Sequence, residues 1–276
     1  AMGSGQESTF YGDMADLVVG LEMVSPTGVL RTRDVPASAT GPALKALLTG
    51  SEGAFGVLVA VTLKIFRHQP GHRRRFSFIF GDWSRAVEAV REIAQGEFGR
   101  PSVLRLSDPE ESETALTLYG VAGTPLESLI RLRGLRPGRR CLLIGCADGE
   151  KGYARHVHQR IRRIGRGFKG VYLGGYPVRR WEHGRYSDPY LREDLNDFGI
   201  FIDTLETTVT WESLAPVYEG VRGFIKSRPR TLCLTHASHF YPQGTNLYFI
   251  FIGRMEGLEA FRAFHGGIVE RILASG

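Results

Sequence analysis

Gly50-Ser-Glu-Gly-Ala-Phe-Gly-Val57 places three glycines within eight residues, between a stretch with helical spacing (41–48) and a β-rich stretch (56–66). Because glycine has no Cβ, such a loop lets the backbone approach a ligand closely and turns N–H groups toward it. A tight turn from a helix into a strand would use the same residue types. The pattern of residues by itself leaves both interpretations open.

The segment before this loop has the pattern of a β-hairpin. Residues 16–24 alternate well enough for a strand, residues 25–28 predict a turn, and residues 29–32 predict the second strand. Pro70 and the basic cluster that ends at Arg75 mark a boundary. About 70 residues precede it, fewer than the roughly 100 of a usual independent domain.

From Phe76 onward, strands alternate with amphipathic helices. The predicted strands cover 75–80, 102–106, 140–146, 231–239 and 246–253, and the predicted helices cover 82–94, 125–135, 152–167, 211–227 and 258–274. Asp82 and Thr210 are the predicted N-caps of two of these helices. This order predicts an α+β fold, in which an antiparallel, ferredoxin-like sheet is covered by helices on one face.

The composition is that of a globular protein with a large core. Of the 276 residues, 42% are hydrophobic and 23% are charged. No stretch approaches the roughly 18 apolar residues that span a bilayer, and the start lacks a secretion signal, so a cytoplasmic location is expected. Cys141, Cys146 and Cys233 fit neither a disulfide framework nor a zinc site, and they are expected to be small core residues.

Arginine dominates the net charge of +6, since only five of the 35 Lys+Arg residues are lysines. A guanidinium donates parallel hydrogen bonds, which suits a small-molecule substrate that carries a phosphate or a carboxylate. The basic runs 73–75, 139–140 and 160–166 are not interleaved with aromatic residues, so no nucleic-acid partner is expected. Most of these runs are expected to be solvated faces.

The glycine-rich stretch resembles Gly-Ser-Glu-Gly-Thr-Leu-Gly-Val/Ile, the motif with which FAD-linked oxidases of the vanillyl-alcohol-oxidase superfamily hold their flavin. Here Ala54 and Phe55 replace the usual threonine and leucine, so the backbone role remains and a threonine hydroxyl contact is lost. Residues 4–8, 11–13, 16–19 and 41–42 resemble further segments of that family in the same order. The resemblance implies FAD as the cofactor and the following cofactor-binding residues: Ser4, Glu52, Gly53, Ala54, Phe55, Gly56, Val57 and Leu58.

Three later segments resemble the alkyldihydroxyacetone-phosphate synthase family. Residues 102–108 resemble Ser-Ile-Arg-Leu-Met-Asp, whose arginine is needed for activity, which implies that role for Arg105. Residues 188–195 resemble Tyr-Ile-Arg-Asp-Leu, whose arginine binds substrate, which implies that role for Arg192. Residues 241–251 resemble Tyr-Asp-Ala-Gly-x-x-Ile-Tyr-Phe-x-Phe, whose second tyrosine is the catalytic acid/base, which implies that role for Tyr248.

Each of these residues also has a purely structural interpretation. Arg105, inside an apolar strand, would pair with a carboxylate, and Tyr248 would be a core residue. Arg192 would form a salt bridge on a helix surface with one of three neighbours, Asp188, Glu193 or Asp194.

Two histidines in a predicted strand raise the question of a metal site. His236 and His239 are three residues apart, so in a regular strand their side chains would face opposite sides. Shared ligation is therefore not expected, and no metal is predicted.

The resemblance implies a flavin-dependent transferase of the ether-lipid type. In such a synthase the flavin N5 attacks the ketone carbon of acyl-dihydroxyacetone phosphate, the acyl group leaves and a fatty alcohol replaces it. An FAD-dependent 2-hydroxy-acid dehydrogenase is the alternative enzyme, although its histidine-rich metal site cannot be placed here. A non-catalytic binding module is the alternative of another class, with residues 198–202 or the basic helix 152–167 meeting a partner or an anionic membrane surface.

The resemblance also implies a domain organisation. Residues 1–3 are expected to be a cloning scar, residues 4–70 part of a PCMH-type FAD-binding domain, and residues 71–276 the cap (substrate) domain. The chain is thus expected to be the C-terminal two-thirds of such an enzyme, without the pyrophosphate-binding part, and to be inactive by itself. A homodimer is left open.

Overall fold

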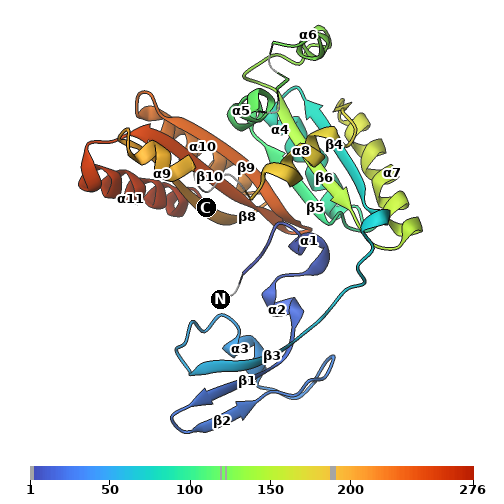
Figure 1. Cartoon of the computed structure of the whole chain (residues 1–276), viewed down its shortest axis with the longest axis vertical. Helices are drawn as coiled ribbons and strands as arrows, with labels where there is room; N and C mark the ends of the chain where they lie inside the picture. Colours follow the sequence, from blue (N-terminus) through green and yellow to red (C-terminus); the bar gives the residue numbers. More distant parts are fainter. Residues whose placement is uncertain (1–2, 119, 122, 187–190) are drawn as a thin grey trace.

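The computed structural model describes residues 3–118, 120–121, 123–186 and 191–276. These residues form two sheets, one of three strands near the N-terminus and one of seven strands in the remainder (Figure 1). The extended residues 64–69 connect them. The chain therefore has a small lobe and a large lobe.

The small lobe is the predicted hairpin with one further strand. β1 (Val18–Ser25) pairs antiparallel with both β2 (Gly28–Arg31) and β3 (Val57–Leu63), which confirms the hairpin. Two short helices accompany this sheet, α2 (Met14–Leu17) and α3 (Leu44–Leu48). Its small core consists of Val18, Leu21, Met23 and Leu48. Every side chain of β3 is exposed although the strand is apolar, so the described residues leave β3 uncovered.

The large lobe contains an antiparallel sheet in the order β7-β4-β6-β5-β9-β10-β8. Its strands are β4 (Arg74–Phe80), β5 (Val103–Ser107), β6 (Cys141–Ala147), β7 (Val171–Tyr172), β8 (Ile200–Thr210), β9 (Leu232–Tyr241) and β10 (Gly244–Arg254). The predicted antiparallel α+β fold is confirmed. The three cysteines are buried and free, as predicted.

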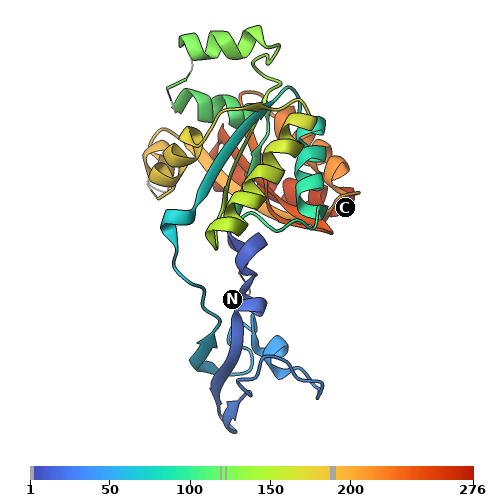
Figure 2. The same cartoon turned by 90° about the vertical axis from the view of Figure 1, so that its right-hand side faces the viewer.

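Four helices cover one face of this sheet: α4 (Trp83–Gln95), α7 (Lys151–Gly167), α10 (Leu214–Ser227) and α11 (Gly257–Ser275). Alternate strand residues point into this layer and form the main core, which includes Phe76, Phe78, Phe80, Leu106, Leu143, Phe249 and Phe251. Figure 2 shows α7, in yellow-green, lying across the strands. None of the described helices is long and apolar enough to cross a membrane.

The opposite face of the sheet is divided into two halves. Over β4 and β6, the apolar side chains are covered by α5 (Pro109–Leu118), α6 (Pro125–Leu132) and α8 (Tyr176–Gly184). Over β5, β9, β10 and β8, the same face carries the polar side chains of Arg105, His236, Tyr248 and Glu206, and apolar ones such as Leu234 and Ile250 follow further along the strands. We call this second half the polar half-face.

Of the two predicted helix caps, Asp82 is confirmed and Thr210 is wrong. Asp82 caps α4 as predicted, because its side chain accepts a hydrogen bond from the Arg85 N–H. The helix predicted from residue 211, however, begins at Leu214. Thr210 is the last residue of β8, where it pairs with Gly244 of β10, so sheet pairing holds it outside the helix. β8, α5 and α8 were not predicted.

Gly145 of β6 pairs with Phe76 of β4 and with Leu104 of β5. A Cβ there would lie 2.5 Å from the carbonyl oxygen of Val103 and against the ring of Phe76. We expect Gly145→Ala to destabilise the protein by roughly 1–3 kcal/mol through overpacking. Gly223→Ala in α10 is the control, since a Cβ there meets nothing within 4 Å, and helix propensity favours alanine. Thermal unfolding of both variants tests this; equal melting temperatures would contradict it.

Candidate active site

The polar half-face brings together side chains from four strands. Ser107 pairs with His236, His236 with Tyr248, and Tyr248 with Glu206. Directly paired residues of antiparallel strands point to the same side of the sheet. Arg105, two residues from Ser107 in β5, therefore shares this face. Two of the predicted site residues, Arg105 and Tyr248, are thus on one surface.

Arg105 is tied into a buried charge cluster. Its Nη2 donates to Glu111 Oε1 at 2.7 Å, and His236 Nδ1 lies 3.0 Å from the same oxygen. The Arg105 Nη2 to His236 Nδ1 distance is 3.1 Å. Burial alone would raise the pKa of Glu111, but the Arg105 charge and the His236 contact outweigh it and hold that pKa well below its usual range. Glu111 is therefore a carboxylate.

Arg105 also forms the ion pair with a carboxylate that was its alternative, purely structural interpretation. The guanidinium has a carboxylate partner in Glu111, and Arg105 is nevertheless partly exposed on the polar half-face. An ion pair that holds one edge of a guanidinium leaves other N–H groups available to an anionic ligand. The two interpretations of Arg105 are compatible.

Tyr248 stands beside this cluster. Its ring stacks on the His236 ring, with centroids 4.9 Å apart and an angle of 21° between the planes. The Tyr248 hydroxyl hydrogen-bonds to none of the described residues, and the side chain is only partly buried. Tyr248 is thus not a satisfied core tyrosine, and its hydroxyl is available to a ligand.

A second carboxylate–histidine pair lies on the other side of Tyr248. His239 Nδ1 is 3.3 Å from Glu206 Oε1, and Asn246 donates to the same oxygen at 2.8 Å. The hydrogen bond from His239 is the largest of the effects that lower the pKa of Glu206. Glu206 is therefore also ionised near neutral pH.

The prediction that His236 and His239 face opposite sides is wrong. His239 has a φ of 54°, and His239 and Phe240 together stand opposite the single residue Thr245 of β10. This bulge interrupts the alternation, so Phe240 enters the core while His239 stays on the polar half-face. Among the described residues, no group of three or more His, Cys, Asp or Glu side chains has the arrangement of a metal site.

The glycine loop lies in the small lobe, between α3 and β3. Gly50, Gly53 and Gly56 have φ values of 82°, 86° and 149°, and Glu52 has a φ of 51°. A Cβ at Gly53 would meet nothing within 4 Å, so its backbone is open to a ligand. The N–H groups of Gly53 and Phe55 donate to no described residue.

These features fit a bound flavin nucleotide. Open amides in a loop with positive φ form a concave set of donors for an anionic or carbonyl group. Next to them, Phe55, Val57 and Leu58 expose apolar surface that a planar ring would cover. The residues from Glu52 to Leu58 are those that would hold FAD.

Ser4 is placed between the two lobes rather than in this loop. Its Oγ is 2.8 Å from the Tyr241 hydroxyl, as is the Oγ of Ser8. These bonds attach the N-terminal segment, including α1 (Ser8–Tyr11), to the end of β9. Ser4 also lines an open cavity of about 800 Å³ with Lys64 and Phe66.

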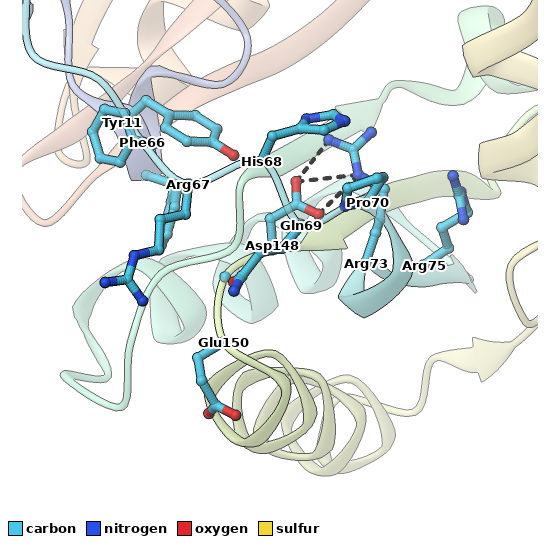
Figure 3. A pocket seen from close by; sticks show the side chains of 12 residues that line it. Tyr11, Phe66, Arg67, His68, Gln69, Pro70, Arg73, Arg75, Asp148 and Glu150 are labelled. Atoms are coloured by element: carbon cyan, nitrogen blue, oxygen red, sulfur yellow. Dashed lines mark hydrogen bonds and ion pairs between the residues drawn. The ribbon is translucent and has the colours of Figure 1, made fainter.

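An adjoining cavity of about 470 Å³ lies along the connection between the lobes (Figure 3). Arg73 in its wall pairs with Asp148, at 2.6 Å, and with Glu182, at 2.9 Å. Arg75 pairs with Glu182 at 2.7 Å. Part of the basic run 73–75 is therefore internally neutralised rather than a solvated face. In α7, by contrast, Arg155, Arg163 and Arg166 are exposed, as predicted.

Arg192 belongs to α9 (Leu191–Asn196), which packs against β8 at the edge of the sheet. Residues 188–190 of its motif, and with them the suggested pairing with Asp188, lie outside the described residues. β8, against which α9 packs, is also the strand that carries Glu206.

Glu111 and its contact with His236 were not predicted from the sequence. The signal for α5 was present, since Asp108, Pro109 and the acidic first turn are a helix-start pattern. The Asp108 side chain does accept from the Glu111 N–H at 2.8 Å. No local pattern would have paired Glu111 with a residue 125 positions away.

The fold and these clusters belong to a recognisable class of protein. The family model for FAD linked oxidases, C-terminal domain, matches residues 69–276. The chain belongs to this family, which places it among flavin-dependent enzymes and identifies its cofactor as FAD.

Individual relatives within this family are similar over most of the chain. An alkyldihydroxyacetonephosphate synthase from Dictyostelium discoideum is 29% identical, over 91% of this chain and 43% of that protein. The uncharacterized FAD-linked oxidoreductase YgcU from Escherichia coli (strain K12) is 29% identical, over 90% of this chain and 50% of that protein. A solved structure of an alkyldihydroxyacetonephosphate synthase is similar with a TM-score of 0.86 and 27% identity, over 100% of this chain and 52% of that chain. The chain thus spans about half the length of these relatives.

Proposed function

We propose that this chain is the substrate-binding part of a flavin-dependent transferase of the alkyldihydroxyacetone-phosphate synthase type, which exchanges an acyl for an alkyl group on dihydroxyacetone phosphate. The observation that carries the proposal is that Arg105 and Tyr248 both contact His236 on the polar half-face, while the Tyr248 hydroxyl bonds to none of the described residues. Relatives of that name match nearly the whole chain.

The side chains have distinct tasks in this proposal. FAD supplies a ring that can accept an electron pair. Tyr248 moves a proton at a carbon next to the substrate carbonyl, a task that requires a donor–acceptor group within hydrogen-bond reach. Arg105 and Arg192 supply guanidinium groups for the phosphate and the developing negative charge.

A second candidate is an FAD-dependent oxidation of a 2-hydroxy acid. The observation in its favour is the pair of imidazoles, His236 and His239, on the same surface as Arg105. A guanidinium would bind the carboxylate of such a substrate, and an imidazole would accept its hydroxyl proton. The relative YgcU carries the name of an oxidoreductase.

The flavin spectrum of the full-length flavoprotein distinguishes the two. We expect long-chain acyl-dihydroxyacetone phosphate to leave the anaerobic flavin oxidised while fatty acid is released and a fatty alcohol is incorporated. Bleaching of the flavin by members of a panel of 2-hydroxy acids, with no fatty acid released from acyl-dihydroxyacetone phosphate, would instead establish the oxidoreductase.

A further inference from the structure

His236 has a contact geometry that the proposed function does not yet use. The imidazole is almost fully buried and meets two charged groups through one nitrogen, Nδ1. Its other nitrogen, Nε2, hydrogen-bonds to none of the described residues. Nε2 is also not enclosed, since it is absent from the buried side-chain atoms that lack a hydrogen-bond partner. One side of the ring is thus anchored and the other is open.

The anchoring contacts select a tautomer. Arginine can only donate, so Nδ1 either accepts from Arg105 or carries the proton and donates to Glu111. The first choice would set a nitrogen lone pair 3.0 Å from a carboxylate oxygen. The second gives a charge-assisted hydrogen bond, while Arg105 keeps its own 2.7 Å bond to the same carboxylate. The geometry therefore favours Nδ1–H, with a free lone pair on Nε2.

A carboxylate that holds an imidazole through Nδ1–H leaves Nε2 oriented as a base. We propose that His236, oriented by Glu111, is a general base that removes the proton from a hydroxyl group of the substrate. The O–H bond breaks, the electron pair stays on oxygen, and the proton binds Nε2. Glu111 is the positioning residue, because it stabilises the resulting imidazolium.

This inference deepens the proposed function and rests on it. A hydroxyl proton has to leave in both candidate reactions, from the fatty alcohol in the exchange and from the 2-hydroxy acid in the oxidation. The stacked ring of Tyr248 places a second proton carrier beside His236, at a centroid distance of 4.9 Å. His236 would take the proton from the substrate hydroxyl, and Tyr248 would move the proton at the carbon next to the carbonyl.

The charged surroundings of His236 bear on its pH dependence. Burial lowers its pKa, and so does the positive charge of Arg105 in β5, whereas Glu111 of α5 raises it. His239 of β9 also lowers it, and Glu206 of β8 and Tyr248 of β10 face the same cluster. The imidazole is therefore neutral at pH 7, as a base must be. Activity should fall as the pH drops below the ordinary histidine range of about 6.5.

The tautomer can be measured on this chain without any turnover. Long-range proton–nitrogen NMR of the histidine-labelled protein is expected to show His236 protonated on Nδ1, with the signals assigned by their loss in His236→Gln. Glu111→Gln should lower the titration midpoint of His236 by about one pH unit, because its contacting anion is removed. A proton on Nε2 would overturn the proposal.

Kinetics of the full-length flavoprotein give the second test. His236→Gln is expected to lower kcat by about 10²-fold and to abolish the acidic limb of the pH profile, with unchanged flavin content and melting temperature. His158→Gln, in α7 on the opposite face of the sheet, is the control and should retain activity. Retention of wild-type kcat and pH profile in His236→Gln would exclude a catalytic role. If neither substrate class is turned over, the proposed function fails. The tautomer of His236 and the effect of Glu111→Gln on its titration then show independently whether Glu111 orients His236 as a base.

Discussion

Tyr248→Phe is expected to lower kcat/KM of the full-length flavoprotein by between about 10²- and 10⁴-fold, the usual contribution of a positioned acid/base group. The substitution removes only the hydroxyl oxygen, which bonds to none of the described residues. The ring can keep its stack on His236. The loss should therefore fall on chemistry rather than on folding, and steady-state kinetics with the acyl-dihydroxyacetone phosphate measure it.

The control for this variant is another tyrosine of the same lobe. Tyr172→Phe also removes one hydroxyl, at 3.3 Å from His158 Nε2 near α7, and it should leave kcat/KM unchanged. Flavin absorbance and melting temperature should match the wild type in both variants. A Tyr248→Phe enzyme with wild-type kcat/KM would remove Tyr248 from the mechanism.

Arg222→Met is expected to cost roughly 3–5 kcal/mol of folding free energy, because it leaves a buried carboxylate without its cation. Asp108 is fully buried, and Arg222 Nη1 donates to its Oδ2 at 2.8 Å. The Tyr218 hydroxyl donates to the same oxygen at 3.2 Å. For a domain of this size the melting temperature should fall by roughly 6–20 °C.

The effect of Arg222→Met should depend on pH in a defined direction. Burial raises the pKa of Asp108 to about 7, although the charge of Arg222 opposes this. Removing Arg222 raises that pKa further, so the variant folds best with Asp108 protonated. A carboxyl whose folded pKa lies above its unfolded value loses stability as the pH rises. The difference in melting temperature between variant and wild type should thus be larger at pH 8 than at pH 5.

Arg262→Met in α11 is the matched control for Arg222→Met. Arg262 pairs with Glu259 at 3.4 Å, but both side chains are mostly exposed. Exposed pairs contribute less than about 1 kcal/mol, so its melting temperature should stay near that of the wild type at both pH values. Equal shifts in the two variants would show that Asp108 is not held by Arg222.

The elements that could be predicted from the sequence are those whose pattern is local. The strands near 75–80 and 140–146 were recognisable as short, continuous apolar runs, which the structure buries almost completely. The helix from Asp82 was recognisable because its apolar residues follow the helical period and a cap residue marks its start. β8 was missed because only Leu205 and Val209 of its side chains are buried and the others are exposed or partly buried without a regular period, so hydrophobicity alone does not outline it. Its pairing with β10 also explains the late start of α10.

In the candidate site, too, the residues within short local motifs could be predicted, whereas the contacts between distant strands could not. Arg105 and Tyr248 were found through short motifs that resemble a family, and their roles remain predictions. The contact of Arg105 with His236 depends on the pairing of β5 with β9, which lie more than 100 residues apart. The position of His239 depends on a bulge in β9, which strict strand alternation excludes.

Because β3 is uncovered, the glycine loop that precedes it also has to hold the strand in register. A strand with one buried face is kept in register by its side chains, since a one-residue slip would turn that face outward. β3 has no buried face, so its side chains cannot resist such a slip. Gly56 does, because a Cβ there would collide with the carbonyl oxygen of Val24, the residue that pairs with Val57. The alignment of the small sheet and the shape of the glycine loop are therefore set by the same residue, Gly56.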